Sequence, residues 1–336
     1  MKGWFLSMLK ESILVTGGCG FIGTSLIAAV RATWPNLNIR VLDNLETGSE
    51  ERLGKVAAFE RKSSENCVGK EGVVLIKGDI RDRDTVIAAS RGCACVIHLA
   101  GNTGVAPSVA DPRVDMEYNV VGTFNVLEAA RINRVRRFVF ASSGAPAGQV
   151  TPPIHEELAP HPTSPYGASK LAGEGYCSAY FHTFGVGTVC LRFGNVYGPG
   201  SLHKSSVVAK FVRQALNDEV CEIFGDGEQT RDFIYIDDLV RAIMLAMHEN
   251  VDGETFQIAT GNERTVSEVA ELVGNALERY GRNMRVLHGK FRTGDVRRNF
   301  SDTRKARRLL GWSAEIELQE GIERTVAYFL AGDTSW

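Results

Sequence analysis

Short apolar runs alternate with longer stretches of helical periodicity through residues 1–198. The runs are rich in Val, Ile and Leu, and they are nearly continuous in apolar character. That pattern is typical of strands whose two faces are both covered by helices. Their order predicts repeated βαβ units around one parallel sheet, a doubly wound α/β domain. The predicted strands are Ile13–Gly17, Ile39–Asn44, Val73–Asp79, Cys95–Ala100, Phe138–Ser142 and Thr188–Gly194.

Two of the intervening helices stand out. Val114–Arg134 is long and carries apolar residues at helical spacing. Tyr166–Thr183 begins just after Pro165, which suits the first turn of a helix.

The pattern changes at about Pro199, where shorter strands and separate helices predict a smaller C-terminal α/β lobe. We therefore expect a first domain over residues 1–198 and a lobe over residues 199–336, with residues 232–250 returning to the first domain. The strands predicted for the lobe are Glu222–Phe224, Asp232–Ile236 and Thr255–Ala259. Its predicted helices are Val207–Asn217, Val266–Tyr280 and Leu318–Leu330.

Composition narrows the function classes. With 38 Lys+Arg and 40 Asp+Glu the net charge of the 336 residues is −2, which argues against a nucleic-acid-binding protein because such proteins need a concentrated basic surface. No apolar run is long enough for a membrane span. Seven scattered cysteines predict neither a disulfide framework nor a zinc site, and the histidine spacing predicts no metal site. We expect a reducing, cytoplasmic setting.

Three glycines follow the first predicted strand and open the next helix. Gly17 suits a tight turn, Gly20 a close approach of the backbone to a pyrophosphate, and Gly23 close packing of helix on strand. Asp43 ends the next strand, twenty residues beyond Gly23, where a carboxylate would hydrogen-bond an adenosine ribose. The pattern predicts a Rossmann-type dinucleotide site. Because Asp43 would repel an extra phosphate, NAD is favoured over NADP.

A second cluster supplies candidate catalytic groups. Tyr166 and Lys170 are four residues apart and share one helix face. A nearby ammonium group and a cationic nicotinamide would both lower the pKa of the phenol toward neutrality, so the phenol could act as a base. Ser142 and Ser143 end the preceding strand and could place a hydroxyl group beside the tyrosine.

Together these motifs resemble the extended short-chain dehydrogenase/reductases, in particular the nucleotide-sugar epimerases and dehydratases, and the likeness covers almost the whole chain. The matching segments are T-G-G-C-G-F-I-G, D-N-L, H-L-A, N-V-V-G-T, S-P-Y-G-A-S-K, R-F-G-N-V-Y-G-P-G, G-D-G-E-Q-T-R-D-F-I-Y-I-D-D, R-T-G-D and A-R-R-L-L-G-W.

The resemblance implies roles for individual residues. Tyr166 would be the base, Lys170 would bind the nicotinamide ribose, and Ser143 would hydrogen-bond the reacting sugar hydroxyl. The implied NAD-binding residues are Gly17, Gly20, Phe21, Ile22, Gly23, Asp43, Asn44, Asp79, Ile80, Leu99, Ala100, Tyr166 and Lys170. The implied nucleotide-sugar contacts are Ser143, Asn195, Arg231, Arg292 and Asp295. The resemblance also implies a homodimer, paired through the two long helices.

Departures from the family pattern bear on the reaction. Dehydratases of the family carry an Asp-Glu pair after the strand that ends at Ser143, and decarboxylating relatives carry a Glu at the position of Ala145; here residues 144–148 contain no carboxylate. Asn102–Gly104 and Pro146–Gly148 also differ from the usual residues. The resemblance therefore implies a 4-epimerase of a nucleotide-diphosphate sugar, most simply UDP-linked. The alternatives are a dehydratase or decarboxylase using Glu156 or Glu157, and a non-catalytic NAD-binding regulator.

Overall fold

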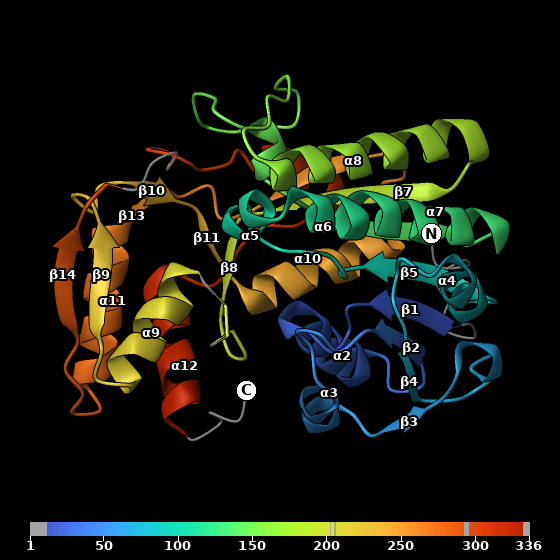
Figure 1. Cartoon of the computed structure of the whole chain (residues 1–336), viewed down its shortest axis with the longest axis horizontal. Helices are drawn as coiled ribbons and strands as arrows, with labels where there is room; N and C mark the ends of the chain where they lie inside the picture. The colour runs from blue at the N-terminus through green and yellow to red at the C-terminus, as the bar shows by residue number, and fades with distance from the viewer. Residues whose placement is uncertain (1–11, 202, 205, 292–295, 332–336) are drawn as a thin grey trace.

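The computed structural model describes residues 12–201, 203–204, 206–291 and 296–331. An eight-stranded sheet, parallel throughout, runs in the order β12-β7-β6-β5-β1-β2-β4-β3 (Figure 1). Its strands are β1 Ser12–Thr16, β2 Asn38–Asp43, β3 Phe59–Arg61, β4 Val73–Lys77, β5 Cys93–His98, β6 Arg137–Ser143, β7 Gly187–Phe193 and β12 Thr255–Ile258. The doubly wound α/β fold predicted from the sequence is confirmed, and each of the six predicted strands overlaps an observed one.

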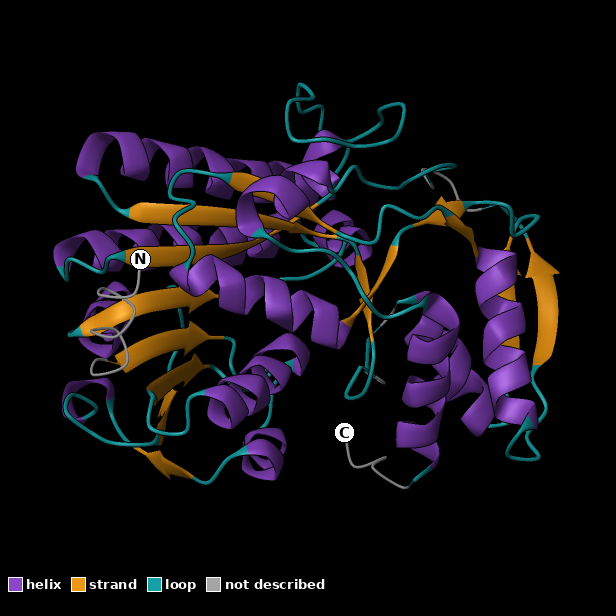
Figure 2. Cartoon of the chain, turned by 180° about the vertical axis from the view of Figure 1, so that it is seen from behind, coloured by secondary structure: helices purple, strands orange, loops and turns teal. Residues whose placement is uncertain are grey.

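Helices cover both faces of the sheet (Figure 2). On one face α4 (Arg83–Ser90), α7 (Thr123–Ile132) and α8 (Pro165–Phe184) pack side by side. On the other face α2 (Phe21–Thr33) packs against α10 (Ile236–His248), with α3 (Glu50–Val56) beside α2. The alternation of strand side chains explains why both faces must be covered. In β1, Leu14 joins the apolar cluster under α7, whereas Ile13 and Val15 join the cluster under α2 and α10.

The predicted helix over residues 114–134 has an interruption. It consists of α6 (Pro112–Met116), a π-helical stretch η2 (Glu117–Gly122) and then α7. At Gly122 a Cβ atom would lie 2.5 Å from the Ile80 side chain, so the glycine permits close approach of η2 to the loop after β4. Periodicity alone cannot reveal a single widened turn, and such turns are frequent at functional sites.

The smaller lobe lies at one end of the molecule (Figure 1). β9 (Val220–Phe224) and β14 (Arg285–Gly289) form a two-stranded parallel sheet, and α9 (Val207–Leu216) packs on β9. α11 (Val266–Glu278) packs against α9 and against α12 (Leu318–Leu330). Short elements complete the chain: β8 Asn195–Tyr197 with β11 Phe233–Tyr235, β10 Thr230–Arg231 with β13 Arg264–Thr265, α5 Val105–Ala110, and single turns η1 Ser64–Asn66, η3 Ala145–Ala147 and η4 Ala306–Leu310.

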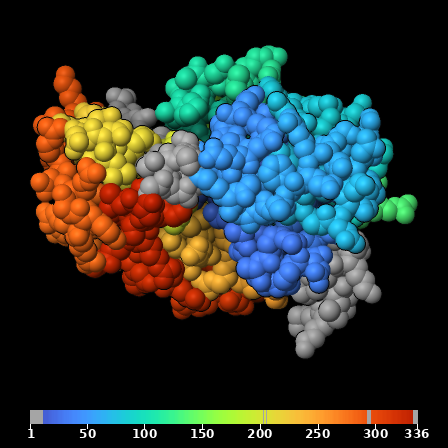
Figure 3. Space-filling view, turned by 90° about the horizontal axis from the view of Figure 1, so that it is seen from below, coloured from blue at the N-terminus to red at the C-terminus, as the bar shows by residue number. Residues whose placement is uncertain are grey.

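The chain crosses between the sheet and the lobe more than once. α10 returns from the lobe to lie on α2, and β12 then pairs with β7 in the central sheet. The assignment of Thr255–Ala259 to the lobe was therefore wrong. A short buried strand has the same sequence pattern in either sheet. Only its pairing with Cys190–Phe193 shows that it belongs to the central sheet. Seen from below, N-terminal residues in blue lie against later residues in gold and red (Figure 3).

None of the described helices combines the length and apolar character that crossing a membrane requires.

Candidate active site

The carboxyl ends of the central strands bring most of the predicted site residues to one edge of the sheet. Gly17 follows β1, Asp43 ends β2, Asp79 follows β4, Leu99 follows β5 and Ser143 ends β6. Ligands of open parallel sheets bind at this edge.

The glycine turn leaves an open helix terminus. Gly17 has φ +70°, and a Cβ atom there would lie 2.7 Å from the backbone nitrogen of Ala100. A Cβ atom on Gly23 would lie 2.4 Å from the Gly17 carbonyl oxygen. Gly20 caps α2 without a side-chain hydrogen bond, and the first turn carries no acid. The N–H groups of this turn, with the helix dipole, suit the diphosphate of a dinucleotide.

Asp43 joins the glycine turn to the loop after β2. It is 7% exposed, and its two carboxylate oxygens accept hydrogen bonds from the backbone N–H groups of Cys19 and Leu45, both at 2.9 Å. Burial raises the pKa of the carboxyl group, and these two bonds oppose the rise. Each oxygen retains a further lone pair, which is what recognition of a ribose diol requires.

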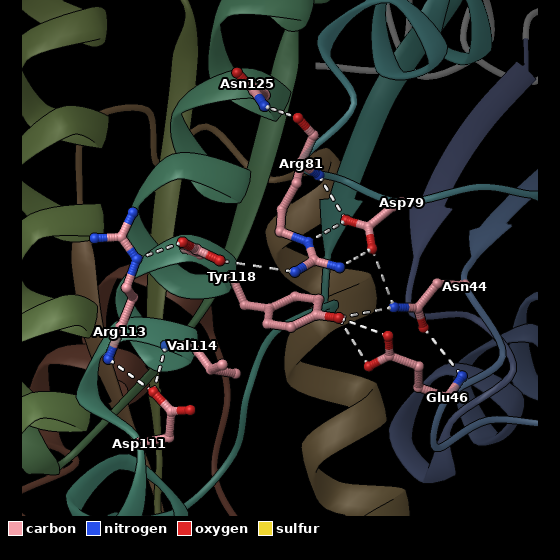
Figure 4. Close-up of polar contacts among 10 residues, drawn as sticks. Asn44, Glu46, Asp79, Arg81, Asp111, Arg113, Val114, Tyr118 and Asn125 are labelled. Atoms are coloured by element: carbon pink, nitrogen blue, oxygen red, sulfur yellow. Dashed lines mark hydrogen bonds and ion pairs between the residues drawn. The ribbon is translucent and has the colours of Figure 1, made fainter.

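A polar network lies beside Asp79 (Figure 4). Arg81 forms two hydrogen bonds to the Asp79 carboxylate, at 2.9 and 2.7 Å, and stacks 4.0 Å above the Tyr118 ring. The Tyr118 hydroxyl donates to Glu46, with O–O distances of 2.7 and 2.8 Å, and lies 3.4 Å from the Asn44 amide nitrogen. Sequence reasoning named Asn44 and Asp79 but not the other three. The spacing of Asp79 and Arg81 could have indicated their pair, whereas no local signal connects Tyr118 with Glu46.

Ser143, Tyr166 and Lys170 are brought together where β6 meets the start of α8. Ser164 caps α8 by accepting the Gly167 N–H at 3.1 Å, with Pro165 in the first turn, so Tyr166 lies at the site end of the helix. Lys170 is 5% exposed; its Nζ atom donates to the Ala141 carbonyl at 2.8 Å and lies 5.9 Å from the centre of the Tyr166 ring.

Burial shapes the ionisation of both groups. It raises the pKa of the Tyr166 phenol, although hydrogen bonding with Ser143 opposes the rise. It lowers the pKa of the Lys170 ammonium group to about 8. The lowering of the tyrosine pKa predicted from the sequence is therefore not produced by these side chains alone, because desolvation has the larger effect.

His98 is part of the framework. Its ring nitrogens hydrogen-bond the hydroxyl groups of Thr16, at 2.7 Å, and Thr123, at 3.0 Å. Burial, reinforced by the charge of Lys170, lowers its pKa to about 3, so the ring is neutral and ties β1 and β5 to α7.

Apart from Ser143, the residues predicted to contact the nucleotide sugar all follow β7 in the chain. Asn195 lies at the start of β8, and its N–H donates to the Asp232 carbonyl at 2.8 Å. The Arg231 guanidinium donates to the carbonyl oxygens of Thr230, at 2.6 Å, and Val296, at 2.7 Å. Arg292 and Asp295 lie outside the described residues.

The segment after β6 begins with the single turn η3. Two glutamates, Glu156 and Glu157, follow later in this segment. Glu156 accepts the backbone N–H of Gln257 at 2.7 Å, and Glu157 is exposed. In the described part of the chain no cluster of three or more His, Cys, Asp or Glu side chains is arranged to hold a metal ion.

The fold and the site together define a Rossmann-type dinucleotide-binding protein with a Ser-Tyr-Lys cluster beside the dinucleotide site. A sequence model of the NAD-dependent epimerase/dehydratase family matches residues 13–259, and the chain belongs to this family. The family's cofactor, NAD, suits the uncapped α2 terminus and the Asp43 carboxylate.

Proteins similar to this chain include both epimerases and dehydratases. A putative UDP-glucose 4-epimerase of Methanocaldococcus jannaschii is 36% identical over 94% of this chain and 97% of its own length. The crystal structure of a Thermotoga maritima UDP-glucose 4-epimerase with UDP-glucose superposes with a TM-score of 0.85 at 34% identity, covering 95% of this chain and 99% of the other. The dTDP-glucose 4,6-dehydratase DesIV of Streptomyces venezuelae, with NAD bound, gives 0.86 at 29% identity, covering 97% and 98%.

Proposed function

We propose that this protein is an NAD-dependent 4-epimerase of a nucleotide-diphosphate sugar, most simply a UDP-linked hexose or N-acetylhexosamine, acting through a transient 4-keto sugar. When bound, NAD would supply the hydride acceptor for carbon 4 and the hydride donor for the return step. The observation that carries the proposal is the Ser-Tyr-Lys cluster together with the absence of carboxylates from residues 144–148, which follow Ser143.

Each group of the cluster has a defined role in the proposal. Tyr166, as phenolate, takes the proton of the sugar 4-hydroxyl and later returns it. The Ser143 hydroxyl hydrogen-bonds the same sugar oxygen and holds it beside Tyr166. Lys170 contacts the nicotinamide ribose, and its positive charge favours the phenolate.

The remaining contacts are divided between the two parts of the chain. The strand ends and the α2 terminus within residues 1–198 hold NAD through Gly17, Gly20, Phe21, Ile22, Gly23, Asp43, Asn44, Asp79, Ile80, Leu99 and Ala100. The nucleotide sugar is held by Asn195, close to the boundary of the first domain, and by Arg231, Arg292 and Asp295 of residues 199–336. Arginine side chains form charge-assisted hydrogen bonds with a diphosphate.

The epimerase is favoured over the dehydratase by the placement of acids. Elimination of water needs an additional acid and base at the sugar. Residues 144–148 provide none, Glu156 is engaged with the backbone of β12, and Glu157 faces solvent.

Product mass separates the candidates. Purified protein would be incubated with UDP-, dTDP-, GDP- and CDP-sugars, and the products analysed by chromatography and mass spectrometry. An epimerase gives a new peak of unchanged mass. Loss of one water or one carbon dioxide would establish a lyase instead, and NAD binding without turnover of any sugar would favour the regulator.

A homodimer and a reducing, cytoplasmic setting complete the proposal. The outer faces of η2, α7 and α8 carry exposed apolar side chains, including Val121, Phe124, Tyr176 and Phe184, and Phe124 packs edge-on against Tyr176 at 5.4 Å. A contiguous apolar surface of this kind suits a self-complementary two-fold interface. The reducing setting is supported by seven buried cysteines that form no disulfide.

A further inference from the structure

Asp115 is a buried carboxylate beside the site that none of the roles above uses. It lies on α6, one turn after Asp111. Asp111 caps that helix by accepting the N–H groups of Arg113 and Val114 (Figure 4). Asp115 is 1% exposed. A buried carboxylate is costly unless a compensating charge or a full set of hydrogen bonds surrounds it.

The hydrogen bonds of Asp115 are incomplete. Its Oδ1 atom accepts the Asn119 amide N–H at 2.9 Å and lies 3.5 Å from the Asn102 amide nitrogen. The Asn119 amide also donates to the Asn102 carbonyl at 2.9 Å, which fixes the orientation of the amide. In the described part of the chain, Asp115 Oδ2 and Asn119 Oδ1 are buried with no hydrogen-bond partner.

Lys170 carries a charge opposite to that of Asp115 and lies on α8, the helix that α6 contacts. Helix α6 packs on α8, and a Cβ atom on Gly101 would lie 2.5 Å from Asn119 Oδ1 and 3.7 Å from Lys170 Nζ. Asn119 Oδ1 and Lys170 Nζ therefore both lie beside the position that a side chain on Gly101 would occupy. The charge of Asp115 acts on both site groups, because it raises the pKa of Lys170 and that of Tyr166.

Among the acids facing Lys170, Asp115 raises the pKa of the ammonium group most, and Glu174 raises it less. Glu174, on α8, is engaged by the Arg192 guanidinium at 2.8 and 2.7 Å and accepts the Ser142 hydroxyl at 2.6 Å. His98, on β5, is neutral, and a positive charge there would oppose that of Lys170. The pKa of the Cys177 thiol, on α8, is raised by burial, so the thiol is uncharged. Neither α5 nor η3 carries a charged side chain.

We propose that Asp115 is a positioning residue whose buried charge, with the oriented amide of Asn119, keeps Lys170 as an ammonium ion facing Tyr166. This inference deepens the proposed function and rests on it for its kinetic consequence. Its direct consequence, the protonation of Lys170, belongs to the protein alone.

Asp115→Asn tests the charge at constant shape, since an amide oxygen can still accept from Asn119. Lysine carrying ¹³C at Cε would be titrated by NMR in the cofactor-free protein, and the Lys170 resonance assigned by its absence in Lys170→Met. In wild type we expect this lysine to titrate at a pKa of about 8, because burial lowers the pKa of its ammonium group. The variant should show a roughly tenfold lower proton affinity.

The matched control is Asp111→Asn, which removes one charge from the exposed start of the same helix and keeps an oxygen for the cap. Its Lys170 titration should match wild type. Asp115→Glu, which retains the charge, should restore a titration close to wild type, and it serves as the test if Asp115→Asn does not fold. An unchanged titration in folded Asp115→Asn, an equal change in Asp111→Asn, or an equal loss in Asp115→Glu would overturn the proposal.

The kinetic consequence is a displacement of the pH profile. Activity falls at low pH because Tyr166 is protonated and at high pH because Lys170 loses its charge. Removing the Asp115 charge lowers both pKa values, so both limbs should move to lower pH. A merely structural loss would reduce the rate without moving the limbs. If no sugar is turned over, the proposed function fails while the NMR titration still decides the role of Asp115.

Discussion

At the scale of single residues, Tyr166 carries the sharpest prediction. Tyr166→Phe removes only the hydroxyl group, so the fold and NAD binding should survive while the proposed base is lost. Loss of a general base costs a factor of ~10² to 10⁴ in rate. The rate would be measured on the same nucleotide sugar as for wild type, with bound NAD confirmed in both proteins. Activity above about a tenth of wild type would show that Tyr166 is not the base.

Ser143→Ala is the companion variant. It deletes one hydrogen bond to the reacting oxygen and leaves the phenol in place, so its loss of rate should be smaller than that of Tyr166→Phe. A larger loss would reverse the assigned roles.

Asp43 should determine the choice between NAD and NADP. We propose that its carboxylate binds the adenosine ribose, where it would repel an added phosphate, so we expect NAD to bind at least ~10-fold more tightly in calorimetric titrations. Asp43→Ala should weaken NAD binding and bring the two affinities close together. Glu46→Gln removes an exposed charge from the same loop and should preserve the preference. Equal affinities in wild type would place Asp43 away from the ribose.

Local signals explain why some site residues could be predicted and others could not. Gly17, Tyr166 and Lys170 stand in short motifs whose spacing itself encodes the geometry. Asp115 carries no such signal, because its burial depends on the packing of α6 against α8. Desolvation of Tyr166 is likewise a property of the folded surroundings, which is why its pKa direction differed from the expectation.

At the scale of elements, Gly173 sets how closely α8 approaches the sheet. A Cβ atom there would lie 2.5 Å from the Phe140 ring, whereas one on Gly175 would meet no atom within 4 Å. Gly173→Ala should destabilise the protein by about 1–3 kcal/mol through overpacking. Gly175→Ala, on the exposed side of the same helix, should stabilise it by about 0.5–1 kcal/mol. Urea unfolding measures both, and similar effects would contradict the close packing of α8.

The elements that differed from the sequence interpretation share a cause. β12 and the π-helical stretch η2 are defined by their neighbours: β12 by pairing with β7, and η2 by contact with Ile80 across Gly122. Hydrophobic periodicity reports the type and approximate position of an element. It contains no information on the sheet that a short strand joins or on one widened helical turn.

At the scale of the whole molecule, a series of aromatic contacts connects α7 with α8, the helices proposed to form the dimer interface. Phe124 on α7 contacts Tyr176 and Tyr180 on α8 at 5.4 and 6.4 Å, and Tyr180 contacts Phe184 at 5.0 Å. Phe124, Tyr176 and Phe184 are each more than a third exposed. An isologous interface would bury this surface twice, once on each protomer.

Phe124→Glu should therefore convert the proposed dimer into a monomer, because it places two charges, one from each protomer, in an apolar contact. Leu287→Glu is the matched control: Leu287 is 59% exposed on β14, away from this surface, so the same change should leave the mass unaltered. Multi-angle light scattering at micromolar protein gives the mass of each variant, and circular dichroism checks that each is folded. A monomeric wild type, or a Phe124→Glu protein that remains dimeric, would contradict pairing through α7 and α8.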